Sequence, residues 1–107
     1  MTLTGKAKEE FEKWFANELE RTEQKLTELG RVHVVDEFYT RITESMQWGV
    51  YQDWADSLGH NISANIFGSS GLFDYEIDFI PSDEIRHTRQ EARNAAVEKL
   101  NELINDQ

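Results

Sequence analysis

The chain has 107 residues, 38% of them hydrophobic and 11% aromatic, which suits a single domain (1–107) with one modest core. Asp and Glu number 21 against 11 Lys and Arg, and a net charge of −10 argues against nucleic-acid binding, which draws its affinity from clustered cations. The absence of cysteine excludes disulfides and thiolate zinc sites. No membrane-spanning run or signal peptide is visible, so we expect a cytoplasmic protein.

A long first helix is predicted over Thr4–Leu29, with Thr4 as its N-cap and Gly30 after its last turn. At 1.5 Å per residue it would extend roughly 38 Å, far beyond the ~13 Å radius of gyration of a compact domain. Such an overhang suggests self-association, and a homodimer is therefore one alternative. The apolar residues of this stretch recur at helical spacing: Ala7, Phe11, Phe15, Leu19 and Leu26.

A second helix is predicted over Thr43–Leu58, with Gly59 as its stop. The stretch before it, 31–42, mixes strand-like alternation with helical spacing, and we favour an irregular start followed by a helical turn. The apolar side chains of the second helix cover an arc of about 200°, more than one packing face needs. Trp48 and Tyr51 lie at the edge of this arc and are candidate contacts for a partner.

An antiparallel β-hairpin is the clearest pattern in the chain. Residues 60–67 and 72–80 alternate strictly and are separated by a Gly-Ser-Ser-Gly loop. If Phe67 lies opposite Leu72, one face is apolar and the other polar, so the register is well specified. The apolar face would carry Ile62, Ala64, Ile66, Phe73, Tyr75, Ile77 and Phe79, and the polar face Asn61, Ser63, Asn65, Asp74, Glu76 and Asp78.

Asp74, Glu76 and Asp78 are the candidate interaction residues of this hairpin. Their carboxylates would stand about 7 Å apart on a solvated sheet face. Such a face has no cleft to shift a pKa, so acid–base catalysis is not indicated. The three acids form either an ordinary wet face that discourages aggregation or a surface for a basic protein partner.

A last helix is predicted to start after Thr88, because residues 88–91 (Thr-Arg-Gln-Glu) form a capping box. Together these elements predict an α+β fold in which the helices cover the apolar face of the hairpin, since a lone hairpin is marginally stable. The apolar stripe of this helix consists of Ala92, Ala96, Leu100, Leu103 and Ile104.

No metal, cofactor or catalytic site is predicted. Asp83, Glu84 and His87 could converge on a cation, but solvated turn residues are the more ordinary interpretation. His33 and His60 lie far from them in sequence, and no nucleophile motif or phosphate-binding loop is present. We therefore expect a protein that is not an enzyme.

Three segments, Ser45–Gly59, Thr88–Arg93 and Ala95–Ile104, resemble a group of small proteins of bacteria and their phages. They cover about a third of the chain, and their combination and order carry the resemblance. The resemblance implies a phage or mobile-element origin; the group has no known activity that could be carried over to this chain.

The start of the last helix also resembles, more weakly, that of double-stranded RNA-binding domains, through Arg89, Ala92 and Arg93. Glu91 interrupts the motif, only two strands are evident, and the net charge would repel phosphate. We expect these arginines to pair with acidic groups instead.

The sequence therefore predicts a non-enzymatic, acidic protein-interaction module, an inhibitor or accessory factor that binds a basic partner, conceivably as a charge mimic of nucleic acid. The alternatives are a structural homo-oligomer, a small-ligand binder and, less favoured, an RNA-binding domain.

Overall fold

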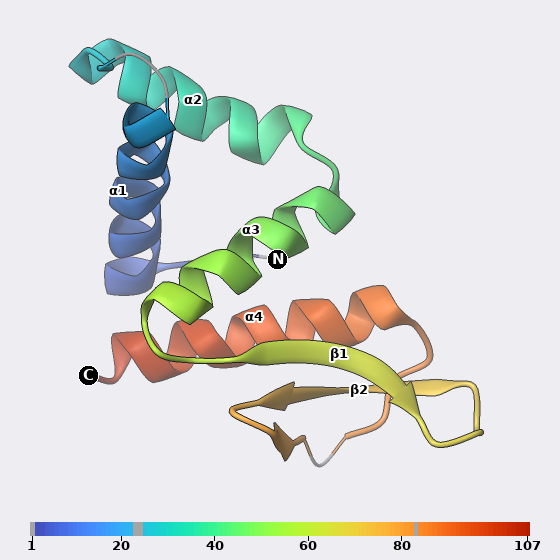
Figure 1. The fold of residues 1–107 in the computed structure, drawn as a ribbon. Coiled ribbons are helices and arrows are strands. Elements are labelled where there is room, and N and C mark those ends of the chain that lie inside the picture. The colour runs from blue at the N-terminus through green and yellow to red at the C-terminus, as the bar shows by residue number, and fades with distance from the viewer. Residues whose placement is uncertain (1, 23–24, 83) are drawn as a thin grey trace.

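The structure is a computed structural model, and it describes residues 2–22, 25–82 and 84–107. The three strands form one antiparallel sheet in the order β1-β2-β3, and α4 packs against β1 and β2 (Figure 1). The predicted α+β fold, with its C-terminal helix on the hairpin, is confirmed. In chain order the elements are α1 (Gly5–Thr22), α2 (Glu28–Arg41), α3 (Glu44–Ser57), β1 (Ile62–Phe67), β2 (Leu72–Ile77), β3 (Ile80–Pro81) and α4 (Arg89–Asn105).

The N-terminal helix is present as α1, but it ends at Thr22 rather than at Leu29. Thr27 is instead the N-cap of α2, where its hydroxyl accepts a hydrogen bond from the N–H of Gly30 (3.0 Å). Gly30 therefore lies inside a helix and does not terminate one. The expected overhang is absent, and the hint of self-association that rested on it is withdrawn.

A side chain of α1, Glu20, links this helix to the residues at the start of α2. The carboxylate of Glu20 accepts a hydrogen bond from the backbone N–H of Leu26 (3.2 Å) and pairs with the guanidinium of Arg31 (2.8 Å). The hydrogen bond from Arg31 lowers the pKa of Glu20 below its ordinary value. The expected irregular start of residues 31–42 is wrong, because α2 is continuous from Glu28 to Arg41.

The second predicted helix is confirmed as α3. The hydroxyl of Thr43 accepts a hydrogen bond from the N–H of Met46 (3.4 Å), Leu58 is the C-cap, and Gly59 follows with a left-handed φ of 83°. The buried residues of α3 are Gln47, Trp48, Tyr51, Trp54 and Ala55.

The hairpin register is also confirmed, from Phe67 opposite Leu72 to Ile62 opposite Ile77. The second strand ends at Ile77, earlier than expected, because the next two residues, Asp78 and Phe79, form a turn with positive φ values of 55° and 68°. The side chain of Phe79 is 76% exposed, so its expected place on the covered apolar face is wrong.

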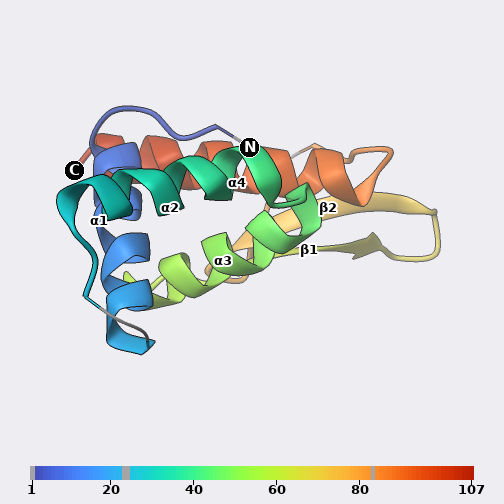
Figure 2. The same ribbon diagram turned by 90° about the horizontal axis from the view of Figure 1, so that it is seen from above.

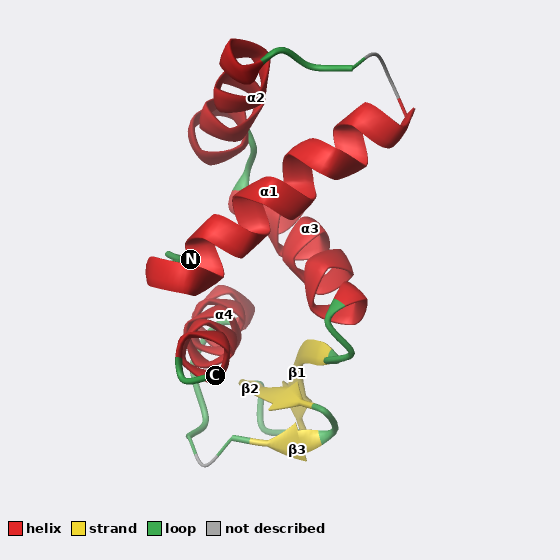
Figure 3. Ribbon diagram, turned by 90° about the vertical axis from the view of Figure 1, so that its left-hand side faces the viewer, coloured by secondary structure: helices red, strands yellow, loops and turns green. Residues whose placement is uncertain are grey.

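The short strand β3, which the sequence did not reveal, pairs Ile80 with Ile77 and Pro81 with Glu76. The chain then continues along β2, and Arg86 exchanges two backbone hydrogen bonds with Phe73, both 2.7 Å long. Figure 3 shows the three strands with α4 beside them and α1, α2 and α3 stacked on the side of β1.

The capping box of α4 is confirmed in its first half, since the hydroxyl of Thr88 accepts a hydrogen bond from the N–H of Glu91 (3.1 Å). The Glu91 carboxylate accepts from the Thr88 hydroxyl (3.2 Å). The predicted stripe faces the core: Ala92, Ala96, Leu100 and Ile104 are buried and Leu103 packs against them.

Aromatic side chains of three helices form the centre of the core. The ring of Phe11 lies 4.9 Å from that of Tyr51, 5.2 Å from that of Phe38 and 5.3 Å from that of Trp54, measured between centroids. These distances are typical of favourable aromatic pairs. The cluster joins α1, α2 and α3 into one unit, which continues through Ile62 to the sheet.

The start of α1 is capped by side chains of α4. The N–H of Thr4 donates to Oδ1 of Asn101 and the N–H of Ala7 to Oδ1 of Asn105, both at 2.8 Å. Asn105 also donates to the carbonyl of Thr4 (3.0 Å). The expectation that the Thr4 side chain caps the helix is wrong, because its hydroxyl accepts instead from Nδ2 of Asn101 (3.1 Å).

The molecule is elongated, with principal extents of 48 × 29 × 21 Å, and α4 runs along its length when it is seen from above (Figure 2). None of the helices in the described ranges combines the length and apolar character needed to cross a membrane.

Candidate functional site

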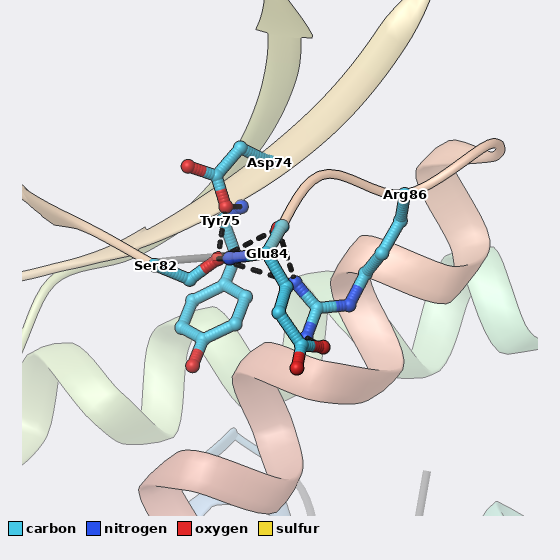
Figure 4. Close-up of polar contacts among 5 residues, drawn as sticks. All are labelled: Asp74, Tyr75, Ser82, Glu84 and Arg86. Carbon is cyan, nitrogen blue, oxygen red and sulfur yellow. Dashed lines mark hydrogen bonds and ion pairs between the residues drawn. The ribbon is translucent and has the colours of Figure 1, made fainter.

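Asp74, expected on a solvated face, is only 8% exposed. Its carboxylate accepts hydrogen bonds from the N–H of Tyr75 (2.7 Å) and from the hydroxyl of Ser82 (Figure 4). It is covered because the segment after β3 folds back along β2. The prediction that Asp74 lies on a solvated sheet face is therefore wrong. Its carboxylate is buried and binds Ser82, which follows β3.

The same segment is held together by Ser82, Glu84 and Arg86 (Figure 4). The guanidinium of Arg86 donates to the carbonyl of Glu84 (2.7 Å) and to the hydroxyl of Ser82 (3.2 Å), and it lies 5.2 Å from the centre of the Tyr75 ring. The polar groups around Asp74 thus bond to one another. This cluster stabilises the third strand.

Asp78 also has structural partners. Its carboxylate accepts from the backbone N–H of Asn61 (2.8 Å) and lies 2.8 Å from Nδ1 of His60. These two hydrogen bonds lower the pKa of Asp78 below its ordinary value. Glu76 is half-buried opposite Ser63. The three predicted acids therefore do not form one free acidic surface.

Trp48 and Tyr51 lie in the core, with exposed fractions of 6% and 0%. The expectation that they stand at an open edge of their helix is wrong, because α1 and α4 cover the wide apolar arc between them. Neither ring is available on the surface of this conformation.

Among the described residues the histidines do not assemble a metal site. Across residues 2–22, 25–82 and 84–107 there is no group of three or more His, Asp or Glu side chains that could hold a metal ion. Asp83, one member of the trio considered with Glu84 and His87, lies outside the described residues.

A groove with an apolar floor and an acidic rim lies between α1 and α3. The two helices cross and then diverge toward their C-terminal ends (Figure 3). A hollow of about 660 Å³ lies between them. Its lining comes from the second half of α1 and from α3: Trp14, Phe15, Glu18, Leu19, Arg21, Thr22, Val50, Asp53, Asp56 and Ser57.

The rim of this groove is negatively charged. Asp53 and Asp56 are exposed, one helical turn apart on α3, and neither forms an ion pair with any residue that the structure describes. On α1, Glu18 is paired with Arg21 (2.8 Å), which leaves an excess of two carboxylates.

This groove was not apparent from the sequence. The signal lay in two facts: Asp53 and Asp56 lie one turn apart on the polar side of the predicted second helix, and Trp14 stands beside the main stripe of the first. Which helix would face them could not be predicted, because the helix boundary at Thr22 was not foreseen.

A second hollow, of about 510 Å³, lies between the β2–β3 turn and α4 and is lined mainly by Tyr75, Ile77, Ile80 and Leu103. Its volume falls in the range of small-ligand sites, about 300–1,000 Å³. Its ionic groups are already paired, His60 with Asp78 and Lys99 with Glu102.

Arg89 and Arg93 at the start of α4 stack on aromatic rings. Arg89 lies 5.2 Å from the centre of Phe73 and Arg93 5.7 Å from that of Trp48. In the ranges described here neither forms an ion pair, so the expected acidic pairing is wrong. The third strand removes one of the differences from RNA-binding domains, whereas the charge of −10 and Glu91 remain.

Comparison with protein-family models, with curated protein sequences and with solved structures finds no match to this chain. Function is therefore inferred from the geometry and charge of the surfaces described above.

Proposed function

We propose that this chain is a non-enzymatic protein-interaction module that binds a basic, amphipathic helical segment of a partner protein in the α1–α3 groove. The observation that carries this proposal is an apolar floor with two carboxylates at its rim that form no ion pair within the described part of the chain. Amphipathic helices bind apolar grooves through residues one turn apart, and complementary charges around the groove steer and orient them.

The groove offers each part of such a helix a counterpart. Trp14, Phe15 and Val50 are half-buried and would contact apolar anchors. Asp53 and Asp56 would meet Lys or Arg side chains on the polar flank of the partner. The net charge of −10 supports the proposal, because it accelerates the approach of a basic partner and repels acidic ones.

The biological setting is part of the same proposal. A phage or mobile-element origin, which the combined resemblance of Ser45–Gly59, Thr88–Arg93 and Ala95–Ile104 implies, fits a small accessory or inhibitory factor. A basic segment that the groove sequesters would be unable to contact nucleic-acid phosphates at the same time. The chain would then act as a charge competitor and would not act as a catalyst.

The test uses a fluorescein-labelled model peptide of about 18 residues, built from Leu and Lys at amphipathic helical spacing. Fluorescence anisotropy measures its affinity for the chain at about 50 mM and about 300 mM NaCl. The double variant Asp53→Asn/Asp56→Asn should bind roughly tenfold more weakly at low salt, with a shallower salt dependence.

The matched control is Glu9→Gln/Glu98→Gln, which removes two exposed acids outside the groove and so makes the same change in net charge. It should change the affinity less than about twofold. Equal weakening by both double variants would show that only the overall charge matters, and either that result or no binding of the peptide would overturn the proposal.

A further inference from the structure

The backbone directions along β1 follow from the hydrogen bonds on the far side of β2. Phe73 bonds to Arg86, and the carbonyl of Tyr75 accepts from the N–H of Ser82 (3.0 Å). Successive residues of a strand direct their backbone groups to opposite sides. Asp74, between Phe73 and Tyr75, therefore bonds toward β1.

Asn65 lies opposite Asp74 and bonds inward to β2, so Ala64 and Ile66 direct their N–H and C=O groups to the outer edge of the sheet. A hydrogen bond from Nε2 of Gln52 to the carbonyl of Ile62 (3.1 Å) reaches this edge and agrees with that direction. Within the described ranges, the structure gives no hydrogen bond to the outward-directed N–H and C=O groups of Ala64 and Ile66.

The two edges of the sheet are built differently. On the β3 edge the strand is two residues long, contains Pro81 and is followed by the irregular segment that covers Asp74. Proline, short strands and irregular segments are the usual means of preventing edge-to-edge pairing. The strand at the other edge, β1, has six residues with no proline and no charge, and its Ile66 side chain is 53% exposed.

We propose that the outer edge of β1 pairs with the same edge of a second copy of this chain, across a two-fold axis, to give a six-stranded sheet. Ala64 of one copy lies opposite Ile66 of the partner subunit, and the reverse holds on the other side of the axis. This register uses the N–H and C=O of both residues, four hydrogen bonds in total, and places each exposed Ile66 beside an alanine of the partner.

Charge favours a second copy over a basic peptide at this edge. Two chains of charge −10 repel over most of their surfaces, but β1 is neutral and can approach an identical neutral strand. A basic segment would find no carboxylate on β1. The contact is far smaller than the roughly 20–30 residues a side of a standard interface, so we expect a dissociation constant of about 10–1,000 µM.

This proposal does not depend on the α1–α3 groove, with which the edge shares no residue. Sedimentation equilibrium of the full chain, from about 10 µM to about 2 mM, should show a monomer–dimer equilibrium in that range. In parallel, amide exchange by NMR should slow at Ala64 and Ile66 as the concentration rises.

Ile66→Lys should weaken dimerisation at least roughly tenfold, because it places two like charges next to the axis. Ile80→Lys is the matched control, because it makes the same chemical change at a 70% exposed position on the opposite edge. It should change the dissociation constant of the dimer less than about twofold. Ala64→Pro is a second edge variant. It removes an outward N–H without removing a β1–β2 hydrogen bond, and it should abolish the dimer.

A chain that stays monomeric throughout this range overturns the proposal. So does a dimer that both edge variants leave intact and whose Ala64 and Ile66 amides exchange at the monomer rate. If the basic model peptide protects these amides while the chain remains monomeric, the edge has a different occupant and the second copy is ruled out.

Discussion

The hydroxyl of Tyr51 is buried in the aromatic core, where no partner among the described residues forms a hydrogen bond with it. Burial raises the pKa of this phenol to about 12, with a smaller contribution from the charge of Glu12. Because a buried polar group without a partner costs free energy, Tyr51→Phe should leave the free energy of unfolding unchanged or raise it by up to about 1 kcal/mol, measured by urea denaturation.

Tyr39→Phe is the matched control for this substitution. The Tyr39 hydroxyl donates to Oε2 of Glu12 (3.0 Å), and its removal leaves the carboxylate without that donor. It should lower the free energy of unfolding by about 0.5–1.5 kcal/mol. Comparable losses for both variants would show that the Tyr51 hydroxyl has a partner in solution.

At the scale of elements, the turn between β2 and β3 depends on Asp78, whose folded-state pKa lies below the ordinary 3.8. The stability that this carboxylate contributes is therefore fully present above pH 3.8 and is lost as the pH falls through the lower, folded-state value. In urea denaturation between about pH 6 and pH 2.5, Asp78→Asn should lose less stability than the parent chain.

Asp53→Asn serves as the comparison, since it removes an acid for which the described residues provide no ion pair. Its free energy of unfolding, plotted against pH, should remain parallel to that of the parent chain. If the profile of Asp78→Asn is also parallel, the hydrogen bonds from Asn61 and His60 do not stabilise the turn.

Elements whose signals are local could be predicted from the sequence. The strict alternation around residues 68–71 fixed the hairpin register, and Thr88 marked the start of α4. The break after Thr22 could not be predicted, because the apolar spacing continues through it and the turn depends on contacts of Glu20 with residues beyond it. The burial of Asp74 was missed for the same reason, since Ser82 reaches it from a later segment.

At the scale of the whole molecule, the net charge of −10 acts on stability as well as on partners. Like charges repel one another more in the compact state, and salt screens this repulsion. Raising NaCl from about 20 mM to about 300 mM should raise the melting temperature by roughly 2–6 °C, measured by circular dichroism.

The double variant Glu9→Gln/Glu98→Gln, the control in the peptide-binding test, should show a smaller increase in melting temperature, because its net charge is −8, from −10 plus two. A melting temperature that stays level or falls with salt would mean that surface ion pairs such as Lys8–Glu12 outweigh the repulsion.

The capping of α1 by Asn105 has a consequence for how the chain folds. The N–H of Ala7 finds its acceptor 98 residues further along, so the first helix acquires its cap only after α4 has formed and docked. During synthesis on the ribosome α1 emerges before α4, which supplies this cap. This contact joins residues that are far apart in sequence, so forming it requires the closure of a long loop. The entropy cost of that closure makes the docking of α1 on α4 a slow step of folding.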